Sequence, residues 1–138
     1  MKNIIRSIIM FLVFCAICSG AWAGGSSENQ NKSQWAGIYS GVIPAADCPG
    51  IVVVAILNAN GQYRITYQYI DRGTEVFVYS GTFKYDEKAK TITLDSGDLP
   101  RFYKSGKNSL TQLDLEGNII KGQFADNYVL RKVKTANI

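Results

Sequence analysis

The chain has 138 residues, a formal net charge of +4 and no histidine. So small a charge bias, with both signs mixed along the chain, argues against a nucleic-acid partner. Without histidine there is neither a conventional catalytic triad nor a neutral-pH proton shuttle, so we expect a protein that is not an enzyme.

The first residues have the pattern of an export signal. Lys2 and Arg6 precede an apolar run from Ile8 to Ile17, and Ala21-Trp22-Ala23 offers a cleavage pattern of small residues. We expect cleavage after Ala23 and a periplasmic or secreted product. The predicted divisions are a signal peptide at 1–23, a flexible polar linker at 24–34, a domain at 35–133 and a tail at 134–138.

Two cysteines lie inside the export signal and raise the question of a lipid anchor. A bacterial lipobox needs a small residue before the cysteine, whereas Phe14 precedes Cys15 and Ile17 precedes Cys18. We therefore expect no lipid anchor, and an outer-membrane lipoprotein is the less favoured alternative.

The mature chain would offer few metal ligands. Cys48 would be its only cysteine, and both methionines would leave with the signal. Copper and zinc are usually held by several thiolate, thioether or imidazole ligands together. The composition thus predicts no metal site within one chain and no cofactor, and it excludes an intramolecular disulfide.

From Trp35 onward the pattern is one of short strands and frequent turns. The continuous apolar run Ile51 to Leu57 is typical of a strand that is covered on both faces or lies deep in a core. Asn60-Gly61 predicts a hairpin turn in which both residues take positive φ angles. In chain order, strands are expected at 35–42, 51–57, 63–69, 75–85, 91–95, 99–104, 110–115 and 128–133.

Hairpin-like connections join these strands almost throughout, which favours an all-β fold, a small antiparallel up-and-down barrel of about eight strands. A barrel of this size is just wide enough to hold one small ligand. Packing of the interior explains most inward aromatic residues without any ligand, so both interpretations stay open. The candidates for a cavity lining are Tyr39, Tyr63, Tyr67, Phe77, Tyr79 and Phe83.

The connection between the first two strands is the most informative segment. Its prolines and glycine restrict the backbone, and a thiol lies beside a carboxylate, which would disfavour the thiolate. The thiol is either a half-buried apolar group in a turn or an unpaired thiol able to form a mixed disulfide or a dimer. The candidate interaction site comprises Pro44, Ala45, Asp47, Cys48, Pro49 and Gly50.

This loop resembles that of the NlpE-type copper-homeostasis lipoproteins, whose pattern reads Leu-Pro-Cys-Ala-Asp-Cys-x-Gly-Ile. Ala45 replaces the first cysteine of the family's pair, so the pair is broken here. The resemblance extends from Trp35 to about Arg131 and implies the family's N-terminal, lipocalin-like barrel only. It is also carried by Trp35-x-Gly37-x-Tyr39-x-Gly41, Gly61-x-Tyr63, Gly81-Thr82-Phe83, Thr91-Ile92-Thr93-Leu94, Leu113-Asp114-x-Glu116-Gly117-Asn118 and Tyr128-Val129-Leu130.

The resemblance implies a role in envelope stress sensing or copper homeostasis through contact with an envelope protein. The alternative is a lipocalin-like carrier that binds a small hydrophobic ligand inside the barrel. In lipocalin-like barrels a tryptophan of the first strand closes one end and stacks against a basic residue of the last strand. By that analogy we expect a cation–π contact between Trp35 and Arg131, and the Cys48 loop at the open end.

Overall fold

The computed structural model describes residues 34–97 and 99–134, so the predicted signal peptide and nearly all of the predicted linker and tail lie outside the described residues. Among the described residues, no helix is long and apolar enough to cross a membrane. The strands are β1 (Gly37–Ile43), β2 (Ile51–Leu57), β3 (Gln62–Tyr69), β4 (Phe77–Asp86), β5 (Thr91–Leu94), β6 (Phe102–Gly106), β7 (Ser109–Gln112) and β8 (Val129–Lys132), with a short 3-10 helix η1 (Ala125–Tyr128) before β8.

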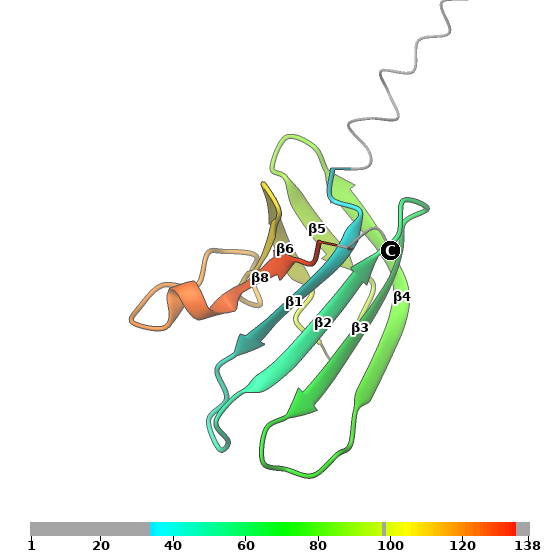
Figure 1. Ribbon diagram of the computed structural model, residues 1–138. Coiled ribbons are helices and arrows are strands. Elements are labelled where there is room, and N and C mark those ends of the chain that lie inside the picture. Colours follow the sequence, from blue (N-terminus) through cyan, green and yellow to red (C-terminus); the bar gives the residue numbers. More distant parts are fainter. Residues whose placement is uncertain (1–33, 98, 135–138) are drawn as a thin grey trace, which may run out of the picture.

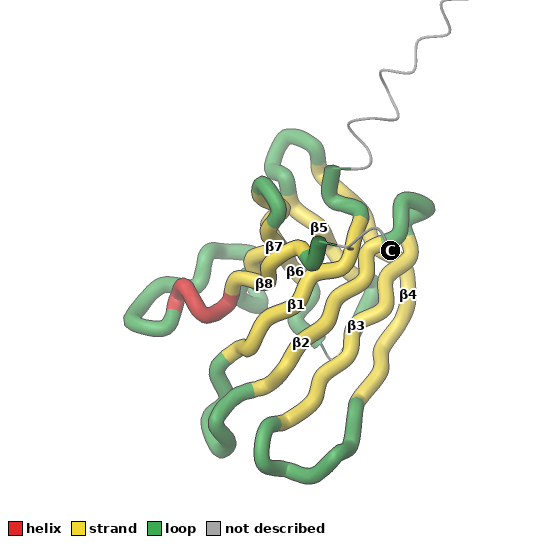
Figure 2. The backbone as a smooth tube through the Cα atoms, viewed as in Figure 1, coloured by secondary structure: helices red, strands yellow, loops and turns green. Residues whose placement is uncertain are grey.

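The strands form a closed barrel in chain order, each antiparallel to its neighbours (Figure 1). Two register pairs close it between β1 and β8: Tyr39 with Lys132, and Ser40 with Arg131. Figure 2 shows that loops join strand to strand almost everywhere, η1 being the exception. The predicted antiparallel up-and-down barrel is therefore confirmed.

The continuous apolar run forms β2 with the predicted bounds, but the expectation of burial on both faces was wrong. Val53, Ala55 and Leu57 are buried, whereas the alternate residues are only half-buried. The sheet curls around one interior, and side chains of successive strand residues point to opposite faces. The outer face of β2 is thus only partly covered.

The hairpin after β2 forms where predicted but with a different turn. Gly61 has a φ of 85°, and Asn60 is not among the described residues with positive φ. The Gly61 amide donates to the Asn58 carbonyl at 3.0 Å, and the Asn58 amide donates to the Gln62 carbonyl at 2.9 Å. This is a turn followed by a single left-handed glycine, so only Gly61 needs the positive φ.

Two predicted strands are displaced along the chain. The strand expected at 99–104 is β6 at Phe102–Gly106, and the strand expected at 110–115 is β7 at Ser109–Gln112. Pro100 cannot donate a hydrogen bond to a strand ladder. Asn108 has a φ of 59° and turns the chain tightly between the two strands, so β6 continues to Gly106 and β7 begins at Ser109.

The core fills the barrel interior with inward-facing side chains. The exposed fraction of Tyr39 is 0%, and its hydroxyl donates to the Trp35 carbonyl at 2.9 Å. Trp35 packs edge-on against Phe83, with ring centroids 4.9 Å apart. The main cluster comprises Trp35, Tyr39, Ile43, Val53, Ala55, Leu57, Tyr63, Ile65, Tyr67, Phe83, Ile92, Leu94, Tyr103, Leu110 and Leu130.

The two ends of the barrel differ. We call the end with the β1–β2, β3–β4 and β5–β6 connections the open end, and the end with Trp35 and the β2–β3, β4–β5 and β6–β7 turns the Trp35 end. In Figure 1 the β1–β2 and β3–β4 connections lie together below the strands, and the β2–β3 and β4–β5 turns lie at the upper end. The Cys48 loop joins β1 to β2 and so belongs to the open end.

The expected contact between Trp35 and Arg131 is wrong. Arg131 is exposed and pairs in register with the outward residue Ser40. Lys132 pairs with the inward residue Tyr39, and its Nζ lies 5.6 Å from the centroid of that ring. Alternation along β8 thus gives Lys132 the cation–π contact, on a different ring.

Candidate functional site

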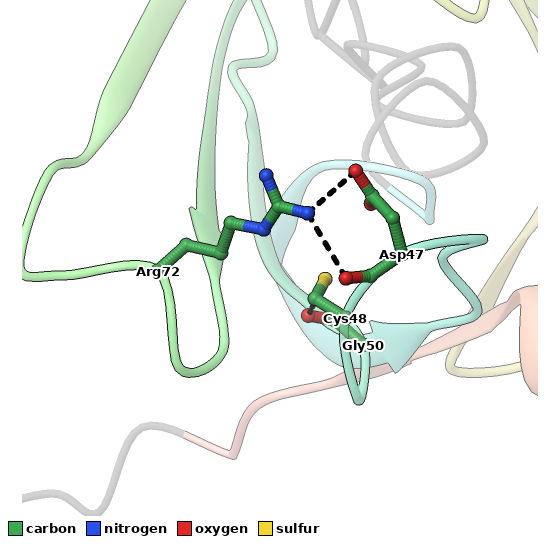
Figure 3. A network of polar contacts seen from close by, with 4 residues as sticks. All are labelled: Asp47, Cys48, Gly50 and Arg72. Carbon is green, nitrogen blue, oxygen red and sulfur yellow. Dashed lines mark hydrogen bonds and ion pairs between the residues drawn. The ribbon is translucent and has the colours of Figure 1, made fainter.

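The Cys48 loop (residues 44–50) is tied to the β3–β4 connection by Arg72. One guanidinium nitrogen of Arg72 donates to Asp47 Oδ2 at 2.7 Å and to the Asp47 carbonyl at 3.0 Å (Figure 3). Both side chains are more than half exposed, so the pair adds little stability but fixes the loop's position. The sequence placed Asp47 beside Cys48 but gave no sign of its partner in another loop.

Gly50 holds the same loop in place through its backbone carbonyl. Its carbonyl accepts hydrogen bonds from the Cys48 thiol at 3.2 Å and from the Ile70 amide at 3.0 Å. A Cβ atom on Gly50 would lie 2.7 Å from Val42 Cγ1 and 3.2 Å from the Ile43 carbonyl. Only glycine therefore allows the loop to lie this close to the end of β1.

The half-buried Cys48 thiol is the basis of a stability prediction. Serine can keep the hydrogen bond to the Gly50 carbonyl, so we expect Cys48→Ser to lower the free energy of unfolding by less than about 1 kcal/mol. Urea unfolding of the two proteins measures this. Cys48→Val is the control, because it cannot donate, and it should cost more. A loss above about 2 kcal/mol for the serine variant would instead place the thiol in the core.

Metal ligands do not gather around this loop. Within residues 34–97 and 99–134 there is no group of three or more histidine, cysteine, aspartate or glutamate side chains able to hold a metal ion. Cys48 is a free cysteine. The position that would pair with it in the family's pattern is occupied by Ala45, which has no ligand atom.

A cavity of about 300 Å³ opens at the same end of the barrel. Tyr67, Phe77 and Tyr79 line it, as the sequence suggested for these three residues. Tyr39, Tyr63 and Phe83 do not line it, because they lie deeper and pack into the core. The full lining is Ile43, Ile51, Tyr67, Tyr69, Phe77, Tyr79, Leu99 and Pro100.

The sequence pattern did not predict every residue that lines the cavity. Tyr69 follows the inward alternation of β3 and could have been included. Leu99 and Pro100 come from the β5–β6 connection, for which no sequence period exists. The hydroxyl of Tyr67, which lines the cavity, lies 3.4 Å from that of the core residue Tyr103, and burial raises the pKa of both.

The rim of the cavity is exposed and apolar. The exposed fractions are 37% for Phe77 and 39% for Tyr79, on the inward-facing side of β4. Val76 and Val78, on the other side, are each 48% exposed. Because successive side chains of a strand point to opposite faces, the exposed apolar segment 76–79 presents Phe77 and Tyr79 beside the cavity and Val76 and Val78 on the outer side.

The backbone of this segment has one unpaired edge. β4 pairs with β5 only over Phe83–Asp86, whereas Phe77–Thr82 pairs with β3 alone among the described residues. The Thr82 carbonyl accepts from the Asp95 amide at 3.0 Å, on the side away from β3. Peptide groups alternate in direction along a strand, so those of Val78 and Ser80 point the same way and meet no strand.

Asp95 ends the paired part of this edge and makes the stability of the protein depend on pH. Its Oδ2 accepts from the Thr82 amide at 3.0 Å and from the Thr82 hydroxyl at 2.9 Å. These hydrogen bonds lower the pKa of Asp95 below its ordinary value of 3.8, and the bond from the Thr82 amide has the largest effect.

A carboxylate with a lowered pKa stabilises the folded state above its ordinary pKa, and this contribution is lost as the pH falls through the folded value. We therefore expect the melting temperature to fall when the pH is lowered below about 4. Asp95→Asn should weaken that dependence in melts between pH 3 and pH 6. An unchanged pH profile in the variant would contradict this role.

The closed eight-stranded antiparallel barrel, with a proline-bounded cysteine loop at one end, defines the class of small up-and-down β-barrels. The family described as the NlpE N-terminal domain matches residues 39–123. The chain belongs to this family.

Individual relatives agree with this assignment. Lipoprotein NlpE of Escherichia coli is 29% identical over 99 residues, which are 71% of this chain and 41% of that protein. The crystal structure of the Cpx pathway activator NlpE from Escherichia coli has a TM-score of 0.54 and 29% identity, covering 72% of this chain and 52% of that one. An inferred lipoprotein from Shewanella oneidensis has a TM-score of 0.66 and 37% identity, covering 75% of this chain and 93% of that one.

The chain therefore spans 41% of the length of the Escherichia coli lipoprotein that it matches.

Proposed function

We propose that the chain is a non-enzymatic protein of the cell envelope that acts in stress sensing or copper homeostasis through contact with another envelope protein. The family and the roles named for its relatives, a lipoprotein and a Cpx pathway activator, support the class of function. The observation that carries the mode of action is the unpaired edge of β4 in the exposed apolar segment 76–79.

The edge of β4 fits an extended segment of a partner. Exposed strand edges bind such segments by main-chain hydrogen bonds, and alternate side chains supply specificity. Here the peptide groups of Val78 and Ser80 would pair with the segment, and the cavity beside Phe77 would take one of its apolar side chains. The Cys48 loop is tied through Arg72 to the β3–β4 connection that leads into this edge.

Copper would then act on this protein indirectly. With the family's first cysteine replaced by Ala45, the loop offers one thiol, and soft metals need several such ligands. We propose that the role in copper homeostasis, like the role in stress sensing, is exerted through protein contact.

The location of the protein is a separate proposal. The names of the relatives as lipoproteins support an envelope location, while the cleavage pattern Ala21-Trp22-Ala23 supports a form without lipid.

The cavity also favours a second candidate, a carrier for a small hydrophobic ligand. Its volume of about 300 Å³ lies at the lower limit of small-molecule sites. Native mass spectrometry of protein purified from its own envelope separates the two candidates. A retained small molecule that is lost on Tyr79→Trp, which fills the cavity, supports the carrier.

Photo-crosslinking in intact cells tests the proposed contact. A photoreactive phenylalanine analogue is introduced at Phe77, on the open end, and at Lys107, on the Trp35 end, as the matched control. We expect a crosslinked envelope protein from the first position and none from the second. Adducts from Lys107 alone would contradict the assignment of the contact to β4.

A further inference from the structure

The Trp35 end carries a second hollow, of about 580 Å³, that the contact at the open end does not use. It lies between the β4–β5 turn, the β6–β7 turn and the first described residue of the chain. Three of its lining residues are lysines: Lys90, Lys107 and Lys132. The remaining lining residues are Gln34, Tyr85, Ser105, Gly106 and Asn108.

These lysines are held near one another by the backbone. The Lys90 carbonyl accepts from the Ser105 amide at 2.8 Å, which ties the β4–β5 turn to β6. The Asn108 carbonyl accepts from the Lys132 amide at 2.9 Å, which ties the β6–β7 turn to β8. Lys90 and Asn108 have φ angles of 53° and 59°, so each turn is tight and reaches little beyond the barrel.

Lys132 is also positioned by its side chain. Its Nζ donates to the Gln34 carbonyl at 3.1 Å and lies 5.6 Å from the Tyr39 ring centroid. A Cβ atom on Gly37 would collide with the Lys132 Cε, so the glycine leaves the path that this side chain takes. The ammonium group is thus held at the Gln34 carbonyl and over the Tyr39 ring, and Lys132 is one of the residues that line the hollow.

None of the three lysines of the hollow forms an ion pair within the part of the chain that the structure describes, where the pair between Arg72 and Asp47 at the open end is the one found within 4.0 Å. Asp86, the last residue of β4, accepts the amides of Lys88 and Ala89 at 2.9 and 3.0 Å. Burial and the nearby carboxylates of Glu87 and Asp86 raise the pKa of Tyr85, so these two acids lie close to one wall of the hollow. The lining residues themselves include three lysines and no carboxylate.

We propose that this hollow binds a phosphate group carried by a small molecule or a lipid headgroup. A phosphate offers several strong acceptor oxygens, and charge-assisted hydrogen bonds from lysines are about twice as strong as neutral ones. The Ser105 hydroxyl and the Asn108 amide add neutral donors on the same wall. The hollow's volume is enough for the phosphate together with a glycerol or a sugar.

Two measurements test this proposal. Amide chemical shifts of the full chain are followed during titration with inorganic phosphate and with glycerol 1-phosphate. Co-sedimentation of the chain is measured with vesicles of phosphatidylglycerol or of phosphatidylcholine. The pocket variant is Lys90→Gln with Lys107→Gln. The control variant is Lys84→Gln with Lys121→Gln, which removes the same charge from exposed positions outside the hollow. Circular dichroism verifies that both variants fold.

We expect shifts at Ser105 and Asn108, and binding about tenfold weaker in the pocket variant but within about twofold of wild type in the control. Binding of glycerol 1-phosphate in solution would identify a free phosphorylated ligand, whereas binding to phosphatidylglycerol vesicles alone would identify a lipid headgroup. No binding in any arm, or an equal loss in both variants, would overturn the proposal.

Discussion

Tyr39→Ala is expected to lower the free energy of unfolding by about 3–5 kcal/mol, because it opens a large cavity in the middle of the barrel. The side chain is fully buried, and its hydroxyl donates to the Trp35 carbonyl at 2.9 Å. The ring also lies under the Lys132 ammonium, so three different contacts are lost together. Urea unfolding followed by circular dichroism measures the loss.

Tyr39→Phe is the matched control for this prediction. It keeps the ring and removes only the hydroxyl, so we expect a loss of about 1–2 kcal/mol from the unmade hydrogen bond. Ser40→Ala, at the next position of β1, points to the other face and should change stability by less than about 0.5 kcal/mol. Equal losses for the alanine and phenylalanine variants would show that the ring is not packed as described.

Trp35→Ala is expected to cost about 3–5 kcal/mol and to open the Trp35 end of the barrel. Trp35 packs against Phe83 at 4.9 Å and against Tyr85 at 5.8 Å between ring centroids. Its Nε1 makes no hydrogen bond within the described residues, so Trp35→Phe should cost much less. Differential scanning calorimetry compares the melts, and a wild-type melt for the alanine variant would contradict the role of Trp35 as a closing residue.

The fold was largely predictable because alternation and turn residues act locally. Along β3, Tyr63, Ile65 and Tyr67 face inward as their period of two predicts. The errors arose where a second influence overrides the local pattern. The apolar run of β2 does not reveal whether a second layer covers its outer face, and Pro100 delays β6 although Leu99 before it is apolar.

The site was only half predictable, since its main contacts join residues far apart in the sequence. The proline-bounded loop and its position at the open end follow from sequence. The link from Arg72 to Asp47 spans 25 positions, and no pattern in either segment announces it. The unpaired edge of β4 depends on the lengths of two strands, because β5 is shorter than β4, and strand ends are the least certain part of a sequence prediction.

The proposed contact of β4 with an extended partner segment depends on the backbone donor of Val78. The Val78 amide points away from β3, so Val78→Pro removes a donor from the free edge while leaving the pairing with β3 intact. Val78→Thr changes the side chain but keeps the donor. The measurement is transcription from a Cpx-dependent promoter in Escherichia coli cells that lack their own NlpE and express the full chain.

We expect the wild-type chain and Val78→Thr to activate the promoter, and Val78→Pro to lose activation by about tenfold, since main-chain hydrogen bonds provide the affinity in this mode of binding. Immunoblots of the envelope fraction confirm equal amounts of the variants. A Val78→Pro variant as active as Val78→Thr, or a wild-type chain without any activity, would contradict the account.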